Sequence, residues 1–274
     1  MLRSLNTAVS GLQQFQQDID VIGNNIANVN TTGFKESRMD FEDTLSQAIG
    51  AGSASNQVGT GVTTAAIQNN FVQGTLSNTG FGSDLAISGQ GFFIVRNTSD
   101  NAQYVTRAGD FHVDASGYLV TSDNMRVQGY SDSGLTTLGD LQIDATGAPA
   151  TADPNATLKS WSVDSTGKIT VTLSDNTTFV RGQVLLQNYT NPGALVKEGS
   201  NLYSASSAAG PLAQPTAPQS KGLGEIQSGA LEMSNVDLTS EMAELITAQR
   251  AFQANARVVT TSDEILQEVT SLKR

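Results

Sequence analysis

Apolar residues recur at alternating spacings of three and four near the start of the chain, for about four heptads. They are Leu5, Ala8, Leu12, Phe15, Ile19, Ile22, Ile26 and Val29. This repeat is typical of a helix with a narrow coiled-coil seam. We predict a helix over residues 3 to 30, about 40 Å long at roughly 1.5 Å per residue. The polar run Asn30, Thr31, Thr32 and Gly33 should end it.

A second heptad pattern occupies the other end of the chain. Its residues follow one another in steps of seven: Leu231, Leu238, Leu245, Phe252, Val259 and Leu266. The stripe is widened by Met242, Val258, Ile265, Val269 and Leu272. Ser234, Asn235 and Asp237 offer side-chain oxygens that can cap a helix N-terminus. We predict a second long helix over residues 236 to 272.

Asparagines are interleaved with the apolar residues of the first helix, although asparagine is a poor helix former. A buried amide without a partner costs about 1 to 3 kcal/mol, so amides beside a seam favour a helix surrounded by other subunits. The alternative is that each stripe packs on the β body of its own subunit. The predicted assembly interface comprises Leu5, Leu12, Ile19, Ile22, Asn24, Asn25, Ile26 and Asn28 of the first helix, and Leu238, Leu245, Phe252, Val259 and Leu266 of the second.

Between the helices the pattern changes to the alternation of β-strands. It runs through DLAISGQGFFIVRN at 84–97, QYVTRAGDFHVDASGYLVT at 103–121 and WSVDSTGKITVTLSDNTTFVRGQVLLQNY at 161–189. One turn recurs, with Asp114 and Gly117 in its first copy and Asp164 and Gly167 in its second. The expected fold class is α+β, with two long terminal helices forming a coiled-coil layer and a central, mostly antiparallel β domain.

Changes in composition divide the chain into parts. We expect an N-terminal helix region at 1–35, a connecting segment at 36–80, a β-rich domain at 81–228 and a C-terminal helix region at 229–274. The stretch GAGSASNQVGTG within the connecting segment has the composition of a flexible linker. Its glycines are predicted to form a joint between the helices and the β domain: Gly50, Gly52, Gly59 and Gly61.

Charge and composition argue against several classes of function. A net charge of −11 and a pI near 4.4 disfavour a nucleic-acid partner. The chain has no cysteine, and its one histidine, His112, is accompanied by no nucleophile elbow. We therefore expect no enzymatic activity, no cofactor and no metal site. No apolar run approaches the roughly 20 residues of a membrane span, and the N-terminus does not resemble a cleaved signal peptide.

Several segments together resemble the bacterial flagellar axial proteins, the family of rod, hook and hook-associated subunits. They are SGL at 10–12, VIGNNIANVNTTGFK at 21–35, DLAISGQGFFIV at 84–95 and EMSNVDLTSEMAELITAQRAFQANARVVTTSDEILQ at 232–267. The resemblance covers both termini and the first β region. Within the family, the segments MLRSLNTAVSGLQQFQ and TTSDEILQEVTSLKR look most like those of a short hook protein. A distal-rod protein is the runner-up.

The resemblance implies a homopolymer in which terminal helices line a tube and β domains lie outside. It implies other axial proteins (rod and hook-associated proteins), a hook cap and the flagellar export apparatus as partners. The expected location is extracellular, in the hook or basal body of the flagellum, after export without a cleaved signal peptide. A hook would be a flexible joint that passes torque from rod to filament, and curved tubes would distinguish it from a straight rod.

A function of another class stays open at this stage. The chain could be a soluble β-domain protein, an enzyme or an adhesin, whose terminal helices only join copies into a small coiled-coil bundle. Electron microscopy of the purified protein separates the two classes, because head-to-tail contacts give tubes or filaments and closed symmetry gives a small particle.

Overall fold

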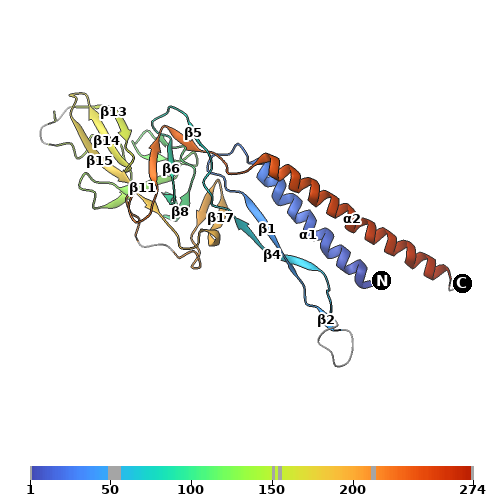
Figure 1. The fold of residues 1–274 in the computed structure, drawn as a ribbon. Helices are drawn as coiled ribbons and strands as arrows, with labels where there is room; N and C mark the ends of the chain where they lie inside the picture. Colours follow the sequence, from blue (N-terminus) through green and yellow to red (C-terminus); the bar gives the residue numbers. More distant parts are fainter. Residues whose placement is uncertain (1, 49–56, 150–151, 154–155, 211–213, 273–274) are drawn as a thin grey trace. The chain divides into compact units, whose positions relative to one another are not determined.

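The computed structural model describes residues 2–48, 57–149, 152–153, 156–210 and 214–272. The chain divides into two compact units. The helical unit comprises residues 1–29, 35–70 and 236–274, and the β unit comprises residues 30–34 and 71–235. Figure 1 labels the elements of both units.

The helical unit contains two long helices that lie side by side (Figure 1). Helix α1 spans Leu2–Ala27 and helix α2 spans Leu238–Ser271. They run antiparallel, because Asn25 near the end of α1 contacts Glu241 near the start of α2, while Gly11 faces Asn255. Asp237 caps α2 by accepting a hydrogen bond from the amide of Thr239 at 2.8 Å, as the sequence predicted.

Helix α1 ends at Ala27, earlier than the predicted residue 30. The side-chain amide of Asn28 donates to the carbonyl oxygen of Asn24 at 2.9 Å. This local bond competes with regular helix hydrogen bonds, which is how asparagine terminates helices. The next amide, that of Val29, already reaches back only three residues, to Ile26.

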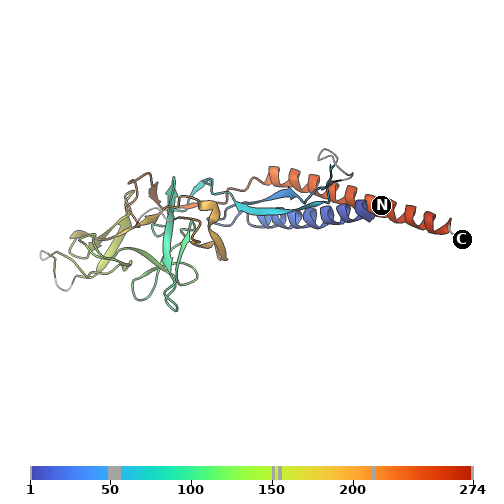
Figure 2. The same cartoon turned by 90° about the horizontal axis from the view of Figure 1, so that it is seen from below.

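A β-hairpin packs along α1 in the same unit (Figure 2). Strand β1 (Ser37–Asp43) pairs antiparallel with β4 (Val62–Asn69), with a register shift between Asp40 and Phe41. The short strands β2 (Gln47–Ala48) and β3 (Gln57–Val58) extend the pairing. The ring of Phe41 lies 5.7 Å from that of Phe15 on α1. The sequence predicts no strands in this segment, because charged residues interrupt the alternation in β1.

The β unit is built on one large sheet whose described pairings are all antiparallel, which confirms the mostly antiparallel β domain. Its main strand order is β13-β14-β15-β11-β7-β8-β18-β17, with β9, β10, β12 and β16 attached at the sides. The bounds are β7 (Phe92–Arg96), β8 (Gln103–Thr106), β9 (His112–Val113), β10 (Leu119–Val120), β11 (Arg126–Tyr130), β12 (Leu138–Asp140), β13 (Leu158–Val163), β14 (Lys168–Leu173), β15 (Thr178–Val184), β16 (Leu186–Gln187), β17 (Val196–Gly199) and β18 (Leu202–Ser204).

Two strand pairs and a short 3-10 helix complete this unit. Strand β5 (Leu76–Asn78) pairs with β20 (Ala230–Glu232), and β6 (Leu85–Ser88) pairs with β19 (Glu225–Ser228). Both pairs join residues that are about 150 positions apart in the sequence, a separation that no local pattern reveals. The 3-10 helix η1 spans Pro192–Ala194.

Successive residues of β7 point to opposite faces of the sheet and into two different cores. Phe93 and Val95 join Leu85 and Ile87 of β6 in the larger core. Phe92 and Ile94 join a smaller cluster with Val105, Tyr189, Leu195, Tyr203 and Ala209. This explains why the run Phe92–Val95 is continuously apolar, with every member buried.

The repeated turn found in the sequence is a repeated structure. The amide of Asp114 donates to the carbonyl oxygen of Tyr118, and the amide of Asp164 donates to that of Lys168. In both copies the aspartate side chain accepts backbone amides within its own turn. Gly117 and Gly167 have φ values of +84° and +77°, which glycine adopts at little steric cost. The aspartates therefore serve turn formation.

Glu232, one member of a buried ion pair, is bonded to three other segments of the β unit. The guanidinium of Arg107 lies 3.3 Å from the carboxylate of Glu232, and both side chains are almost fully buried. The same carboxylate accepts the amide of Gly74, and the Glu232 carbonyl oxygen accepts the amide of Gly33. Residues 30–34, 71–75 and 230–235 are thus fastened to one another where the chain passes into or out of the β unit.

Candidate assembly interface

The seam between α1 and α2 uses small and polar residues beside the predicted apolar ones. On α2, Glu241, Ala248 and Ser262 are the buried positions. The predicted Leu245, Phe252, Val259 and Leu266 alternate with them and are half-buried, whereas Leu238 is 44% exposed. On α1, the predicted Ile22 is buried, and Leu5, Leu12, Ile19 and Ile26 are half-buried. One copy therefore covers these side chains only in part.

Gly11 is a seam residue that the hydrophobic pattern did not reveal. A β-carbon at this position would lie 2.9 Å from the side-chain nitrogen of Asn255. The missing side chain lets α1 and α2 approach closely at this level. Glycine inside a helix costs about 1 kcal/mol relative to alanine. A glycine in the middle of a heptad pattern is therefore the sequence feature that could have identified Gly11 as a position of close helix packing.

Asn25 is the polar centre of the helical unit and is only 2% exposed. Its side-chain oxygen accepts the amide of Ser37 at 3.0 Å, and its side-chain nitrogen donates to the Ser37 carbonyl oxygen at 2.9 Å. The same nitrogen lies 3.2 Å from the carboxylate oxygens of Glu241. One amide thus joins α1 to both β1 and α2.

The other two predicted asparagines lie differently. Asn24 is exposed and Asn28 is half-buried, and the Asn28 amide also donates to the side-chain oxygen of Asn24 at 2.9 Å. Contacts of these residues with neighbouring subunits stay a prediction.

Carboxylates cluster around Asn25. Burial raises the pKa of Glu241, the hydrogen bond from Asn25 lowers it, and the nearby charges of Glu244, Glu36 and Asp18 raise it, for a net upward shift. Burial and the charge of Glu244 also raise the pKa of Asp18. Protonation of Glu241 and Asp18 therefore favours the packed helical unit.

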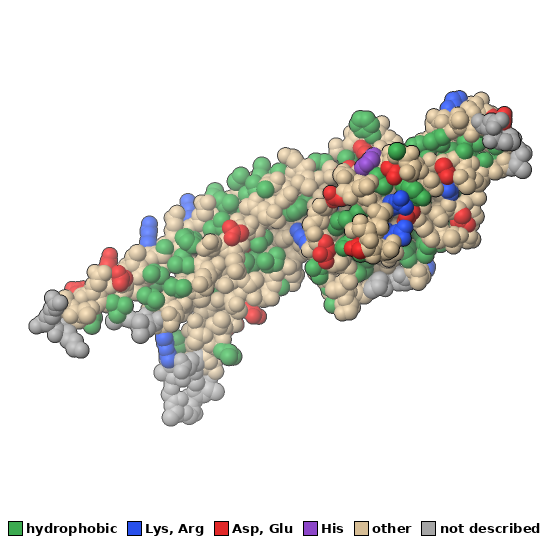
Figure 3. Space-filling model, turned by 180° about the vertical axis from the view of Figure 1, so that it is seen from behind, with side chains coloured by type: hydrophobic (Ala, Val, Ile, Leu, Met, Phe, Trp, Pro, Cys, Tyr) green, Lys and Arg blue, Asp and Glu red, His purple; other side chains and the backbone are tan. Residues whose placement is uncertain are grey.

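Two groups of apolar residues on α2 are left uncovered by the described residues, one on each side of the seam with α1. Met242 and Ile246 form one group, and Val258, Ile265, Val269 and Leu272 form the other, with exposed fractions from 41% to 81%. In the antiparallel register of Gly11 with Asn255, the first described residue of α1 lies opposite about residue 264. Ile265, Val269 and Leu272 thus extend past α1. Figure 3 shows hydrophobic side chains along this unit. Burial of these residues against other copies stays a prediction.

The predicted joint glycines have different surroundings. Gly50 and Gly52 lie outside the described residues. A β-carbon added to Gly59 would meet no atom within 4 Å. Gly61 has a φ of +135°, and an added β-carbon would clash with the hydroxyl of Ser10 on α1. Its carbonyl oxygen accepts the amide of Thr44 at 3.0 Å. Gly61 is therefore required by close packing; a role of these glycines in bending stays a prediction.

Three family models match the chain. "Flagella basal body rod protein" matches residues 5–35, "Flagellar hook protein FlgE/F/G D1 domain" matches 86–171, and "Flagellar basal body rod FlgEFG protein C-terminal" matches 227–272. The first contains most of α1 and the last contains all of α2, so the two helices of the candidate interface lie in regions that the family models describe.

Individual relatives match over the whole chain. The flagellar basal-body rod protein FlgG of Bacillus subtilis (strain 168) is 42% identical over 283 positions, with all of both chains covered. FlgG of Borreliella burgdorferi is 35% identical over 288 positions, again with both chains fully covered. The flagellar hook protein FlgE of Borreliella burgdorferi is 26% identical over 444 positions with the same coverage. The fold and these matches to rod and hook proteins together define a structural protein of the bacterial flagellum. The chain belongs to the flagellar axial protein family of rod and hook subunits.

The comparisons favour the distal-rod alternative over the hook that the terminal segments had suggested. Identity to the rod relatives is 42% and 35%, against 26% to the hook relative. The terminal segments could not decide between them, because one family model of the C-terminal region describes FlgE, FlgF and FlgG together.

Described residues contain no helix long and apolar enough to cross a membrane.

Proposed function

We propose that this protein is a subunit of the distal rod of the flagellar basal body, and that it polymerises with copies of itself into a straight tube. The observation that carries polymerisation is the set of apolar residues on α2 that the described part of its own chain leaves uncovered. In the polymer, Met242, Ile246 and the apolar residues after them pack against helices of neighbouring copies, forming the coiled-coil layer. The half-buried seam residues complete their burial in the same contacts.

The lengths of the alignments support rod over hook. The match to the rod protein of Bacillus subtilis extends over 283 positions, close to the 274 residues of this chain. The match to the hook protein extends over 444 positions, so that relative carries long segments that this chain lacks. The other axial proteins and the flagellar export apparatus are proposed partners, and the basal body is the proposed location.

Negative-stain electron microscopy and sedimentation of the purified protein test this proposal. Straight tubes that sediment above a critical concentration are the expected result. Curved tubes would assign the protein to the hook instead. Small closed particles at every concentration would contradict polymerisation and favour an oligomer joined by its terminal helices.

A further inference from the structure

An exposed aromatic side chain stands on a tightly bonded turn of the β unit. Phe81 is 69% exposed and lies between β5 and β6. The amides of Thr79 and Gly80 both donate to the carbonyl oxygen of Gly229, at 2.8 and 3.2 Å, and the amide of Asp84 donates to that of Phe81 at 3.0 Å. The Thr79 hydroxyl also donates to the Asp84 carboxylate. These hydrogen bonds restrain the backbone of the turn, and the ring of Phe81 projects from it into solvent.

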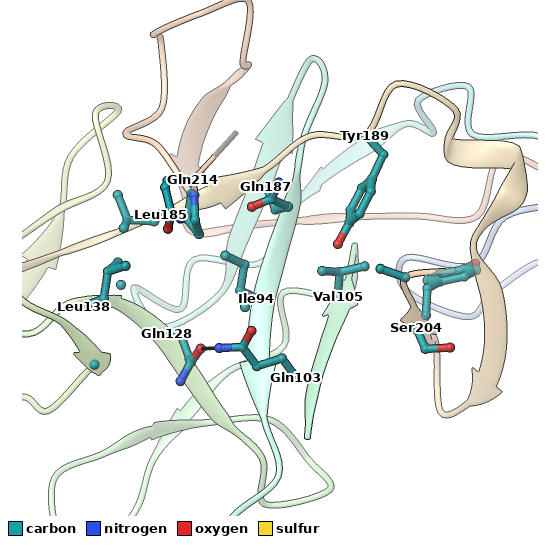
Figure 4. Close-up of a pocket in the computed structure, with 15 residues that line it drawn as sticks. Ile94, Gln103, Val105, Gln128, Leu138, Leu185, Gln187, Tyr189, Ser204 and Gln214 are labelled. Atoms are coloured by element: carbon teal, nitrogen blue, oxygen red, sulfur yellow. Dashed lines mark hydrogen bonds between the residues drawn. The ribbon is translucent and has the colours of Figure 1, made fainter. Parts of the chain in front are cut away.

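A hollow of about 470 Å³ lies elsewhere on the same unit. Figure 4 shows Ile94 and Val105 between the glutamines Gln187 and Gln214 on one side and the hydrogen-bonded pair Gln103 and Gln128 on the other. The apolar residues Ile94, Val105 and Leu185 are buried, and Leu138 is 51% exposed. None of the described residues that line it carries a formal charge.

The hollow fits an aromatic ring by size and by chemistry. An apolar cavity of about 150 Å³ accommodates a benzene molecule, so this hollow has room for a phenyl group and part of its backbone. Amide groups such as those of Gln103 and Gln128 can bond the backbone of an entering turn. A charged side chain would lose its hydration there without gaining an opposite charge.

Phe81 cannot fill the hollow of its own copy. Strand β6, which follows the turn of Phe81, packs through Leu85 and Ile87 on the face of the sheet that Phe93 and Val95 share. Ile94 points to the opposite face, where the hollow lies. Phe81 is not among the described residues that line the hollow, and its side chain is 69% exposed, so the ring does not fill the hollow of its own copy. A contact between them therefore joins two copies.

We propose that Phe81 of one copy inserts into the Ile94–Val105 hollow of a second copy of this chain. The ring and the hollow are different surfaces of one unit, so the contact is head to tail and can repeat from copy to copy along a helical polymer. It gives the β units of the polymer a specific contact in addition to helix packing. This inference rests on the proposed function, because it operates within the polymer.

Substitution of Phe81 tests the energetic part of the proposal. Phe81→Ala should raise the critical concentration for polymerisation by about 10-fold or more, because an aromatic side chain loses its burial. Phe81→Leu keeps a large apolar side chain, so its critical concentration should be close to that of the wild-type protein. Leu158→Ala is the matched control, since Leu158 is 41% exposed but lies on β13, which contributes no residue to the hollow. It should change the critical concentration by less than about twofold. An unchanged critical concentration for Phe81→Ala would overturn the proposal.

Thiol cross-linking tests the geometry, and the absence of cysteine from the chain makes it specific. Gly82→Cys keeps Phe81 and places a thiol next to it, where an added β-carbon meets no atom within 4 Å. Combined with Gln103→Cys at the hollow, it should give a ladder of covalent oligomers when polymer is treated with a short bis-maleimide. The pair Gly82→Cys with Lys159→Cys on β13, and each single variant, should give no ladder.

The outcomes separate this inference from the proposed function. Polymer that forms but yields no ladder from the Gly82→Cys, Gln103→Cys variant would overturn the inference and leave the rod assignment intact. Wild-type protein that forms no polymer would contradict the rod assignment, and the inference with it.

Discussion

At the scale of single residues, the helical unit depends on polar groups with defined partners. Asn25 uses both ends of its amide, on the backbone of Ser37 and on the carboxylate of Glu241. Removing such an amide would leave buried polar groups unpaired, at about 1 to 3 kcal/mol each. The cluster also brings carboxylates together, which makes its stability depend on pH.

Glu241 should give the helical unit a measurable pH dependence. Its folded-state pKa is raised, mainly by burial, so its contribution to stability is fully present below the unfolded pKa and is lost as pH rises through the folded pKa. We expect the helical signal at 222 nm to melt at a higher temperature at about pH 5 than at about pH 7. Glu241→Gln keeps an oxygen for Asn25, so it should raise the melting temperature at neutral pH and reduce the difference.

Glu268→Gln, on an exposed position of α2, is the control for that measurement and should keep the wild-type difference. The same pH dependence in wild type and in Glu241→Gln would show that this carboxyl does not titrate with folding.

Gly61 and Gly59 form a second matched pair of residues. Gly61→Ala places a β-carbon against Ser10 at a positive φ, so it should lower the free energy of unfolding by about 1 to 3 kcal/mol. Gly59→Ala meets no atom and should stay within about 0.5 kcal/mol of wild type. Chemical denaturation monitored by circular dichroism measures both. Equal losses would contradict the close packing of Gly61 on α1.

At the scale of elements, both terminal helices were predictable from heptads and the β domain from alternation and turns. The polar residues of the seam could not be predicted, because Gly11, Glu241 and Ser262 do not belong to the hydrophobic pattern. Their positions in the seam depend on how the two helices pack. The β1–β4 hairpin was missed because Arg38, Asp40 and Glu42 interrupt the apolar alternation. The pairing of β6 with β19 depends on a contact across most of the chain, which no local pattern contains.

The Arg107–Glu232 pair should be essential to the β unit, because Glu232 is also bonded to Gly33 and Gly74 in two further chain segments. Burial lowers the pKa of Arg107, while the charge and hydrogen bond of Glu232 and the neighbouring Tyr203 raise it, for a net downward shift. Arg107→Met would leave a buried carboxylate with no cation, which costs about 3 to 5 kcal/mol. Urea denaturation followed by strand signal measures the loss.

The exposed pair Arg38–Asp40 provides the comparison, because the Arg38 side chain is 71% exposed. Arg38→Met should cost less than about 1 kcal/mol. A similar small loss for Arg107→Met would show that the buried pair contributes little to the β unit.

A charge placed in the seam between α1 and α2 and a charge placed on the uncovered residues of α2 should have different effects. Ile22→Asp places a carboxylate in the buried seam and should disrupt the pairing of α1 with α2 in each copy. Ile246→Asp lies among the uncovered residues, so it should leave helix content unchanged and abolish polymerisation. Leu245→Asp, in the half-buried seam, should also abolish polymerisation while the β unit stays folded. Circular dichroism and sedimentation separate these effects, and Ile246→Leu should polymerise normally. Polymers from Ile246→Asp would contradict burial of Ile246.

At the scale of the whole molecule, the chain contains more apolar surface than its own fold covers. The heptads of both termini already indicated helices that need partners, but a single sequence does not distinguish partners in the same copy from partners in the next. The structure assigns Ile22 and Ala248 to contacts within the copy and leaves Met242, Ile246 and Val258 uncovered. The rod or hook identity depends on comparisons over the whole chain, because the terminal segments are common to both.

Helical reconstruction of tubes assembled from the wild-type protein by electron cryomicroscopy tests the central claim most directly. The account predicts straight tubes in which Met242, Ile246 and Val258 of each copy are buried against helices of neighbouring copies. Tubes that curve, or straight tubes in which these residues of α2 stay exposed to solvent, would contradict it.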